Sequence, residues 1–576
     1  MHWVILLLLL AACAGAPPEL KMPPAGLVWE AEPPFRREKK AGAEPEAKSL
    51  GHFAKGQLLL AAGEFNEALS EFEAAAKADP LNPYLRLRLA SLYLRKGDSE
   101  RALKEAEETI RLDPDGVEAR LLLAGLYSAA GDDLRGIRQY SEALRRDPKN
   151  EEALLYLAAL QLKVGESEKA AQTLEQLLAI NAKSILGLYY LGRVRAKTQL
   201  YLAAEESYRK ALELNPKFEA ALMDLALVYE LQGKAEDAVQ TYQKLLEGSP
   251  ANQWATKRLG ELYVGQNKLD EALSQFQRLQ TVEADPRETR TKIGLIYYEK
   301  GDFERAAMEF NLVLAAEPEN DRVRYFLGSV YAELKAQDKA LEEFSRIPEK
   351  SEYFADARIQ LAFLYEQRDQ TSKAIEAAKS ALGKQGKQKE VLSLLGSLYR
   401  KAKDYPKAIE TVEKVLSLDP KSDQTHFQLG AIYDEGKNRD KAIEHMQKAI
   451  GLNPENAAAL NYLGYTWAEM GVRLDEAEEL IVRALKIEPN DGFYIDSLGW
   501  VYYQKGHYQK AVEQLERAVD LAREDSTIIE HLGDAYDKVG RPGLALERYR
   551  EALKKSKEEE QQKRIREKIQ LLERKI

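Results

Sequence analysis

The feature that most constrains this chain is its self-similarity at a period of 34 residues. From Asp423 to Pro454, small and large apolar side chains recur at helical spacing in two successive segments. The residues Leu429, Gly430 and Tyr433 of this stretch are matched 34 residues earlier by Leu395, Gly396 and Tyr399. A fixed period of this length indicates short units that stack on their neighbours, so no single large core is required.

About fifteen such units follow one another along the chain. They begin at residues 49, 83, 117, 151, 185, 219, 253, 287, 321, 355, 389, 423, 457, 492 and 526. Position 8 of every unit is Gly or Ala, and position 20 is Ala in almost every unit. Two antiparallel helices, A and B, can cross closely only where both side chains are small, so these two positions predict the crossing point of each pair.

The same units carry signals for their turns and ends. Glycine at position 15, as in Gly97, Gly301 and Gly506, predicts the turn between A and B. Proline at position 32, as in Pro80 and Pro216, predicts the end of helix B. These signals together predict an all-α chain.

This pattern resembles the tetratricopeptide repeat (TPR) over residues 49–553. The resemblance implies a TPR α-solenoid, a right-handed superhelix of about 15 antiparallel helix pairs. Residues 554–576 follow the last unit, and Ile565, Ile569 and Leu572 form an apolar stripe there on a strongly charged segment. We interpret it as a C-terminal capping helix, which terminal repeats need for solubility. A basic partner-binding tail is the alternative.

Composition argues against several classes of function. The net charge is −10, whereas general binders of nucleic acid or anionic lipid are basic. The single cysteine, Cys13, excludes an intramolecular disulfide. The histidines show no metal-ligand spacing, and His445, His507 and His531 fall on surface-type positions. The glycines fall at repeat positions and form no phosphate-binding loop. We therefore expect no enzyme, no catalytic residue, no cofactor and no metal.

The N-terminus predicts an export signal. Trp3 to Leu10 is an apolar run of signal-peptide length, too short to span a bilayer. The following Leu10-Ala11-Ala12-Cys13 resembles the bacterial lipobox. That resemblance implies a signal peptide at residues 1–12, acylation of Cys13 and, with Ala14 next, sorting to the outer membrane with the repeats facing the periplasm. The alternative is that Cys13 is an ordinary cysteine in a frayed terminus.

Residues 13–48 are rich in proline and lack helical periodicity, so we interpret them as a lipidated tether. In polyproline form the tether would reach on the order of 100 Å. Its apolar residues, Leu27 to Trp29 and Phe35, would either rest on the first repeat or dock another protein.

The TPR resemblance implies that the A helices line a concave groove with positions 2, 5, 6, 9, 12 and 13. Aromatic side chains at these positions are our candidate partner-binding residues, because Tyr and Trp commonly anchor interfaces. They are Phe427, Tyr462, Tyr465, Phe493, Trp500, Tyr503, Tyr325, Phe363 and Trp254. Packing against the next unit is the alternative for some of them. A carboxylate clamp for a chaperone tail is absent, because Glu261 follows Lys257 and Tyr465 follows Asn461 at the required spacing.

We expect a lipid-anchored scaffold that assembles other envelope proteins on its groove. The overall plan looks like large bacterial TPR lipoproteins, some of which are adaptors that bring a periplasmic carboxyl-terminal processing protease to cell-wall hydrolases. The alternative is a component of an outer-membrane secretion, pilus or exopolysaccharide export machine. An enzyme regulated through repeats would need a catalytic domain, and almost no sequence remains for one.

Overall fold

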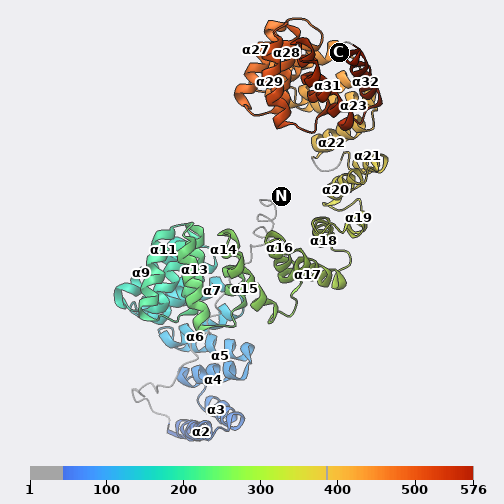
Figure 1. Ribbon diagram of the computed structural model, residues 1–576. Coiled ribbons are helices and arrows are strands. Elements are labelled where there is room, and N and C mark those ends of the chain that lie inside the picture. The colour runs from blue at the N-terminus through green and yellow to red at the C-terminus, as the bar shows by residue number, and fades with distance from the viewer. Residues whose placement is uncertain (1–42, 384–386, 575–576) are drawn as a thin grey trace. The chain divides into compact units, whose positions relative to one another are not determined.

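A computed structural model describes residues 43–383 and 387–574 and shows an all-helical chain (Figure 1). The described residues form 31 α-helices and no strand. Among them, no helix combines the length and the apolar character that crossing a membrane requires. Cys13, the predicted signal peptide and nearly all of the predicted tether lie outside the described residues.

The helices alternate between A, with even numbers, and B, with odd numbers. The first half contains α2 (Ala43–Ala61), α3 (Phe65–Ala78), α4 (Pro83–Lys96), α5 (Ser99–Leu112), α6 (Val117–Ala129), α7 (Asp133–Arg146), α8 (Glu151–Lys163), α9 (Ser167–Ile180), α10 (Ile185–Lys197), α11 (Tyr201–Leu214), α12 (Glu219–Leu231), α13 (Ala235–Gly248), α14 (Gln253–Gly265), α15 (Leu269–Gln280) and α16 (Arg287–Glu299).

The second half contains α17 (Phe303–Ala316), α18 (Asp321–Glu333), α19 (Gln337–Ser345), α20 (Phe354–Gln367), α21 (Thr371–Ser380), α22 (Gln388–Lys401), α23 (Tyr405–Leu418), α24 (Asp423–Glu435), α25 (Arg439–Leu452), α26 (Ala457–Glu469), α27 (Leu474–Ile487), α28 (Gly492–Gln504), α29 (Tyr508–Leu521), α30 (Ser526–Lys538), α31 (Pro542–Lys555) and α32 (Glu559–Glu573). The fifteen predicted helix pairs and the capping helix are therefore confirmed.

The small residues at position 8 lie where the two helices of each pair cross, as predicted. A Cβ added to Gly192 would lie 2.5 Å from the Tyr208 ring. A Cβ added to Gly464 would lie 2.6 Å from the Ile481 side chain and 2.9 Å from the Ala477 carbonyl oxygen. Real Cβ contacts are longer than these, so the spacing of each pair depends on the small residue.

Every A–B turn places position 15 in the left-handed backbone region. Glycine occupies this position in most pairs, as predicted at Gly97 (φ 84°) and Gly301 (φ 74°). Six pairs instead place a side chain there, at Gln199, Asn267, Lys335, Asp369, Lys403 and Lys437. A left-handed conformation costs an L-residue about 1–2 kcal/mol, so stacking with the neighbouring helices must outweigh that strain.

The two ends of the repeat array differ slightly from the predicted boundaries. Helix α2 begins at Ala43, ahead of the first repeat position at residue 49. It can include Pro45, because this proline falls in the first turn, where a helix needs no backbone N–H donor. At the other end α31 runs to Lys555, and the cap α32 begins only at Glu559.

Contacts divide the chain after Glu309 into two compact units, which are described separately. In both units, helices pack mainly on their neighbours in sequence, and some A helices also contact the next A helix. The core of the first unit includes the fully buried Tyr140, Tyr208 and Tyr242. In the second unit Phe310 and Phe344 are fully buried. The candidate site lies in the second unit, on helices α24 to α32.

Candidate functional site

The centre of the candidate groove is the indole of Trp500 on the A helix α28. Its ring stacks on Tyr503 with a centroid distance of 4.7 Å and an interplanar angle of 4°. It also stacks on the imidazole of His531, on α30, at 4.1 Å and 17°. Two of the predicted groove residues are therefore in direct contact, and Trp500 also contacts His531, which was not among the predicted groove residues.

The neighbouring A helices add further aromatic surface. Phe427 on α24 meets Tyr462 on α26 edge to face, at 6.3 Å between ring centroids. Both rings are half-buried, as is Tyr465. Phe493, the second residue of α28, is 56% exposed and lies on the same helix face as Trp500, two turns away. This exposed aromatic area is suited to contact with a partner.

Beneath Trp500 lies a buried polar pair. Nδ1 of His531 is 2.9 Å from a carboxylate oxygen of Asp496, and both residues are buried. Burial alone would lower the pKa of His531, but the Asp496 carboxylate outweighs burial and raises it. The pair thus fixes the imidazole plane on which the indole stacks. The prediction that His531 is a surface residue is therefore wrong. His531 occupies position 6 of its repeat unit, and this position faces the preceding A helix.

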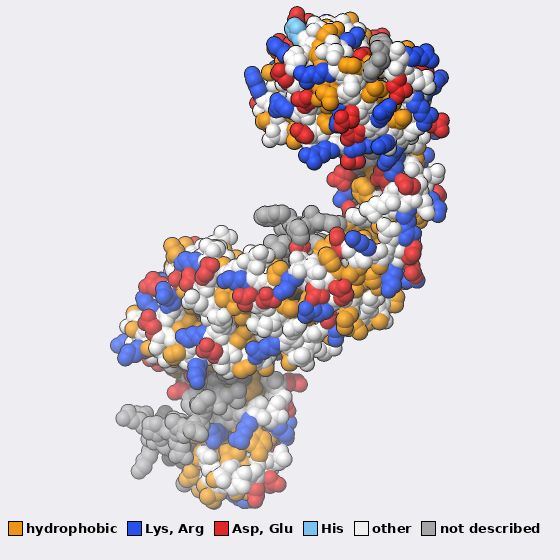
Figure 2. Space-filling view, viewed as in Figure 1, with side chains coloured by type: hydrophobic (Ala, Val, Ile, Leu, Met, Phe, Trp, Pro, Cys, Tyr) orange, Lys and Arg blue, Asp and Glu red, His pale blue; other side chains and the backbone are white. Residues whose placement is uncertain are grey.

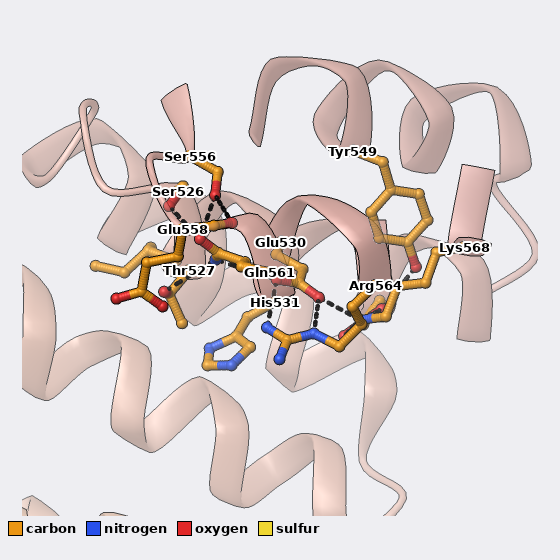
Figure 3. Close-up of polar contacts among 12 residues, drawn as sticks. Ser526, Thr527, Glu530, His531, Tyr549, Ser556, Glu558, Gln561, Arg564 and Lys568 are labelled. Carbon is orange, nitrogen blue, oxygen red and sulfur yellow. Dashed lines mark hydrogen bonds and ion pairs between the residues drawn. The ribbon is translucent and has the colours of Figure 1, made fainter. Parts of the chain in front are cut away.

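The cap α32 adds further polar contacts to α30, the helix that carries His531 (Figure 3). The carboxylate of Glu530, only 2% exposed, accepts hydrogen bonds of 2.8 Å from Arg564 and from Lys568. Arg564 donates two of these bonds, through Nε and Nη2, and Gln561 donates a further one of 3.2 Å. Burial raises the pKa of Glu530, but the bonds from Arg564 and Lys568 outweigh it and bring the pKa to about 2.

Lys568 also bridges to Asp534 at 2.6 Å, and the Tyr549 hydroxyl donates to the same carboxylate. The side chains of Ile565 and Leu572 are buried against α30 and α31. The capping interpretation of this helix is therefore supported by both its charges and its apolar stripe.

The remaining candidate residues differ in accessibility. Phe363 on α20 is 42% exposed. Tyr325 on α18 is 9% exposed, because it packs on Tyr353 and Phe344, so its surface is already used within the chain. In the first unit, Trp254 on α14 is half-buried against Tyr242, with 5.8 Å between ring centroids.

Two polar atoms of the groove lack partners. Nε1 of Trp500 and Oδ1 of Asn461, on α26, are buried and form no hydrogen bond within the described part of the chain. An unsatisfied buried polar atom costs about 1–3 kcal/mol, and such atoms are few in native structures. Over the same residues, no group of three or more His, Cys, Asp or Glu side chains is arranged to hold a metal ion.

Comparison with known proteins gives a consistent result. Family models described as "Tetratricopeptide repeat" match residues 53–117, 87–135, 189–253, 291–353 and 428–492, residues 135–188 and 230–288, residues 493–525 and residues 390–422. Together these segments cover most of the chain.

A curated TPR repeat-containing protein of Pseudomonas aeruginosa is 45% identical over 65 residues, which span 11% of this chain and 11% of that relative. A solved tetratricopeptide repeat protein from Parabacteroides merdae is 22% identical, with a TM-score of 0.33, and the match covers 43% of this chain and 98% of that one. The structure of Naa15/Naa10 bound to HypK-THB is 14% identical, with a TM-score of 0.31, and the match covers 91% and 96%.

Proposed function

The chain belongs to the tetratricopeptide repeat family, and on that premise we propose that it is a non-catalytic scaffold that binds other proteins along the concave face of its A helices. TPR proteins bind other proteins in general. The observation that carries the proposal here is the aromatic surface around Trp500. Stacked rings on rigid helices give a partner a large apolar contact area at a small cost in side-chain entropy.

Two further observations support this assignment. Phe493 stays exposed beside the stacked rings, although a buried position would be more stable for a side chain of that size. The Trp500 indole also retains an N–H without an acceptor. Both features cost stability in the free chain, which is common where a surface serves binding.

The test is capture of a partner by chemical crosslinking in the native envelope, followed by mass spectrometry. We expect Phe493→Ala, and Trp500→Ala combined with Tyr465→Ala, to reduce the yield of the captured protein about tenfold or more, as loss of an interface anchor does. The control is Leu418→Ala with Leu521→Ala, which removes similarly exposed side chains from the B helices α23 and α29. Thermal melting separates binding from packing: if these two groove variants melt at a lower temperature yet capture the partner normally, the rings serve packing only.

The lipid anchor and the envelope location are part of the same proposal. The lipobox-like Leu10-Ala11-Ala12-Cys13 supports acylation of Cys13, after which several acyl chains would hold the protein on the outer membrane. We expect Cys13→Ala to move the protein from the membrane fraction to the soluble fraction after cell fractionation. Retention of the variant in the membrane fraction would refute the anchor.

The identity of the captured protein distinguishes the finer roles. A periplasmic processing protease together with a cell-wall hydrolase would support presentation of substrates to a protease. A pore or a polymerase would support the alternative role in secretion, pilus assembly or exopolysaccharide export.

A further inference from the structure

A second feature of the C-terminal unit is an open hollow beside the aromatic groove. It has a volume of about 500 Å³ and is lined by Ser397, Arg400, Lys401, Lys403, Tyr405 and Glu435. These residues come from the end of α22, the following turn, the start of α23 and the end of α24. Figure 2 shows Lys and Arg side chains gathered where α22 lies.

The lining of this hollow is cationic, although the whole chain carries a net charge of −10. Three of its side chains are cations and one is a carboxylate. Lys401 lies 3.7 Å from Glu366 and 3.6 Å from Asp369, distances too long for good hydrogen bonds. Lys403 forms no ion pair with any residue that the structure describes. Lys403 is therefore the cation of this lining that no carboxylate in the described residues pairs with, whereas Arg400 and Lys401 each have an acidic partner.

The geometry of Arg400 indicates what kind of group fits there. Its Nε and Nη2 atoms both donate to the same oxygen of Glu435, at 2.9 Å and 2.5 Å. A guanidinium can bind a carboxylate through two parallel N–H groups, and here both donors converge on one oxygen of Glu435 instead. The Arg400 and Glu435 side chains are 43% and 37% exposed, so a second carboxylate could reach the same guanidinium from solvent.

Aromatic side chains border this charge. Tyr405 lines the hollow itself, and Phe427 lies two turns from Glu435 on the same face of α24. Tyr462 in turn contacts Phe427. The cationic lining and the Phe427–Tyr462 pair therefore lie on the consecutive A helices α22, α24 and α26.

From this arrangement we propose that the hollow binds an acidic segment of the partner protein, with a carboxylate on Arg400 and Lys403 and a neighbouring apolar side chain on Phe427 and Tyr462. The inference rests on the proposed function and specifies the chemistry of the ligand. Long polyanions such as nucleic acid or an anionic membrane surface are disfavoured, because they would also meet the acidic remainder of the chain. A short acidic segment needs only the local charge.

The probe is a fluorescein-labelled short peptide that repeats Glu-Ser-Phe, and its control has Lys in place of each Glu. Binding to the full chain, purified in detergent, is followed by fluorescence anisotropy at about 0.05 M and about 0.5 M salt, because screening at the higher salt weakens exposed ion pairs. We expect the Glu peptide to bind at low salt, to weaken at high salt and to bind more tightly than the Lys peptide.

Lys403→Gly is the decisive variant. Lys403 has φ 59°, so glycine removes the cation while relieving backbone strain, and the variant should fold at least as well as the parent. Lys335→Gly is the matched control, because Lys335 has φ 56° at the same position of another unit and does not line the hollow. We expect Lys403→Gly to weaken peptide binding about threefold, which is the scale of one exposed ion pair, and Lys335→Gly to leave binding unchanged.

Glu435→Gln should change peptide affinity in the opposite direction. It removes the carboxylate that occupies Arg400 in the free chain, so the Glu peptide should bind about threefold more tightly.

The proposal is overturned if Lys403→Gly and Lys335→Gly bind the Glu peptide equally, or if the Lys peptide binds as tightly as the Glu peptide. It is also overturned if only single-stranded thymidine oligonucleotides or anionic vesicles bind in a way that depends on Lys403. Absence of peptide binding, with partner capture still lost in Phe493→Ala, would reject this hollow and retain the scaffold. If the peptide does not bind and Phe493→Ala still captures the partner normally, both the role of the hollow and the scaffold function are rejected.

Discussion

Gly464→Leu is expected to destabilise the α26–α27 pair by about 3 kcal/mol or more, the upper range for overpacking a tight core. The added Cβ alone would lie 2.9 Å from the carbonyl oxygen of Ala477, which is backbone and cannot rotate away. It would also lie 2.6 Å from Ile481, which is fully buried. The two helices must therefore move apart, which disturbs the stacking of the neighbouring units as well.

Amide hydrogen exchange of α26 and α27, together with urea denaturation, measures this effect. Gly451→Leu is the matched control, because a Cβ at Gly451 on α25 meets nothing within 4 Å. That variant should be neutral or slightly stabilising, since glycine is a poor helix former. Gly430→Leu should fall between the two, since the shortest contact there is the flexible end of Met446, at 2.7 Å. Equal stability of the three variants would contradict the register of the repeats.

The second large effect is expected from Ile565→Asp in the cap. Ile565 is fully buried against the last helix pair, so the substitution loses its apolar contacts and places a carboxylate in the core. We expect α32 to detach at a cost of about 4 kcal/mol, the scale of a large-to-small core substitution with an added polar penalty. Detachment also removes Arg564 and Lys568 from Glu530, whose buried carboxylate then lacks its cations.

Limited proteolysis and hydrogen exchange of α30 and α31 measure this loss. Leu571→Asp is the control on the same helix, because Leu571 is 58% exposed and an aspartate there remains in water. Normal protection of α30 in Ile565→Asp would show that the cap contributes little to the last repeat.

The sequence predicted the helix pairs because two small residues per unit are a strong local signal. The crossings at Gly192 and Gly464 follow directly from position 8. The left-handed turns at Gln199 and Lys403 were not predicted, because a side chain at that position costs strain that only the stacked neighbours offset. Residues 43–48 were assigned to the proline-rich tether, whereas α2 begins at Ala43 and contains Pro45 in its first turn, where proline is tolerated.

The candidate site was predicted less completely. The periodicity assigned aromatic residues to one helix face, and the stacking of Trp500 on Tyr503 agrees with that assignment. Periodicity does not indicate which member of a face is covered by the next helix, so the burial of Tyr325 and His531 had no signal in a single unit. Asp496 and His531 pair because the consecutive A helices α28 and α30 lie side by side at a particular offset along their axes, and the pattern within one unit does not encode that offset.

Packing between neighbours, seen throughout the described residues, has a consequence for biosynthesis. No helix there depends for most of its contacts on a segment translated much later, so each pair can dock on the preceding pair soon after it leaves the ribosome. The growing end would present an unfinished apolar surface until the next pair arrives. Translation of α32 covers the last pair, because Ile565 and Leu572 bury against it while most of the charged side chains of the helix face solvent.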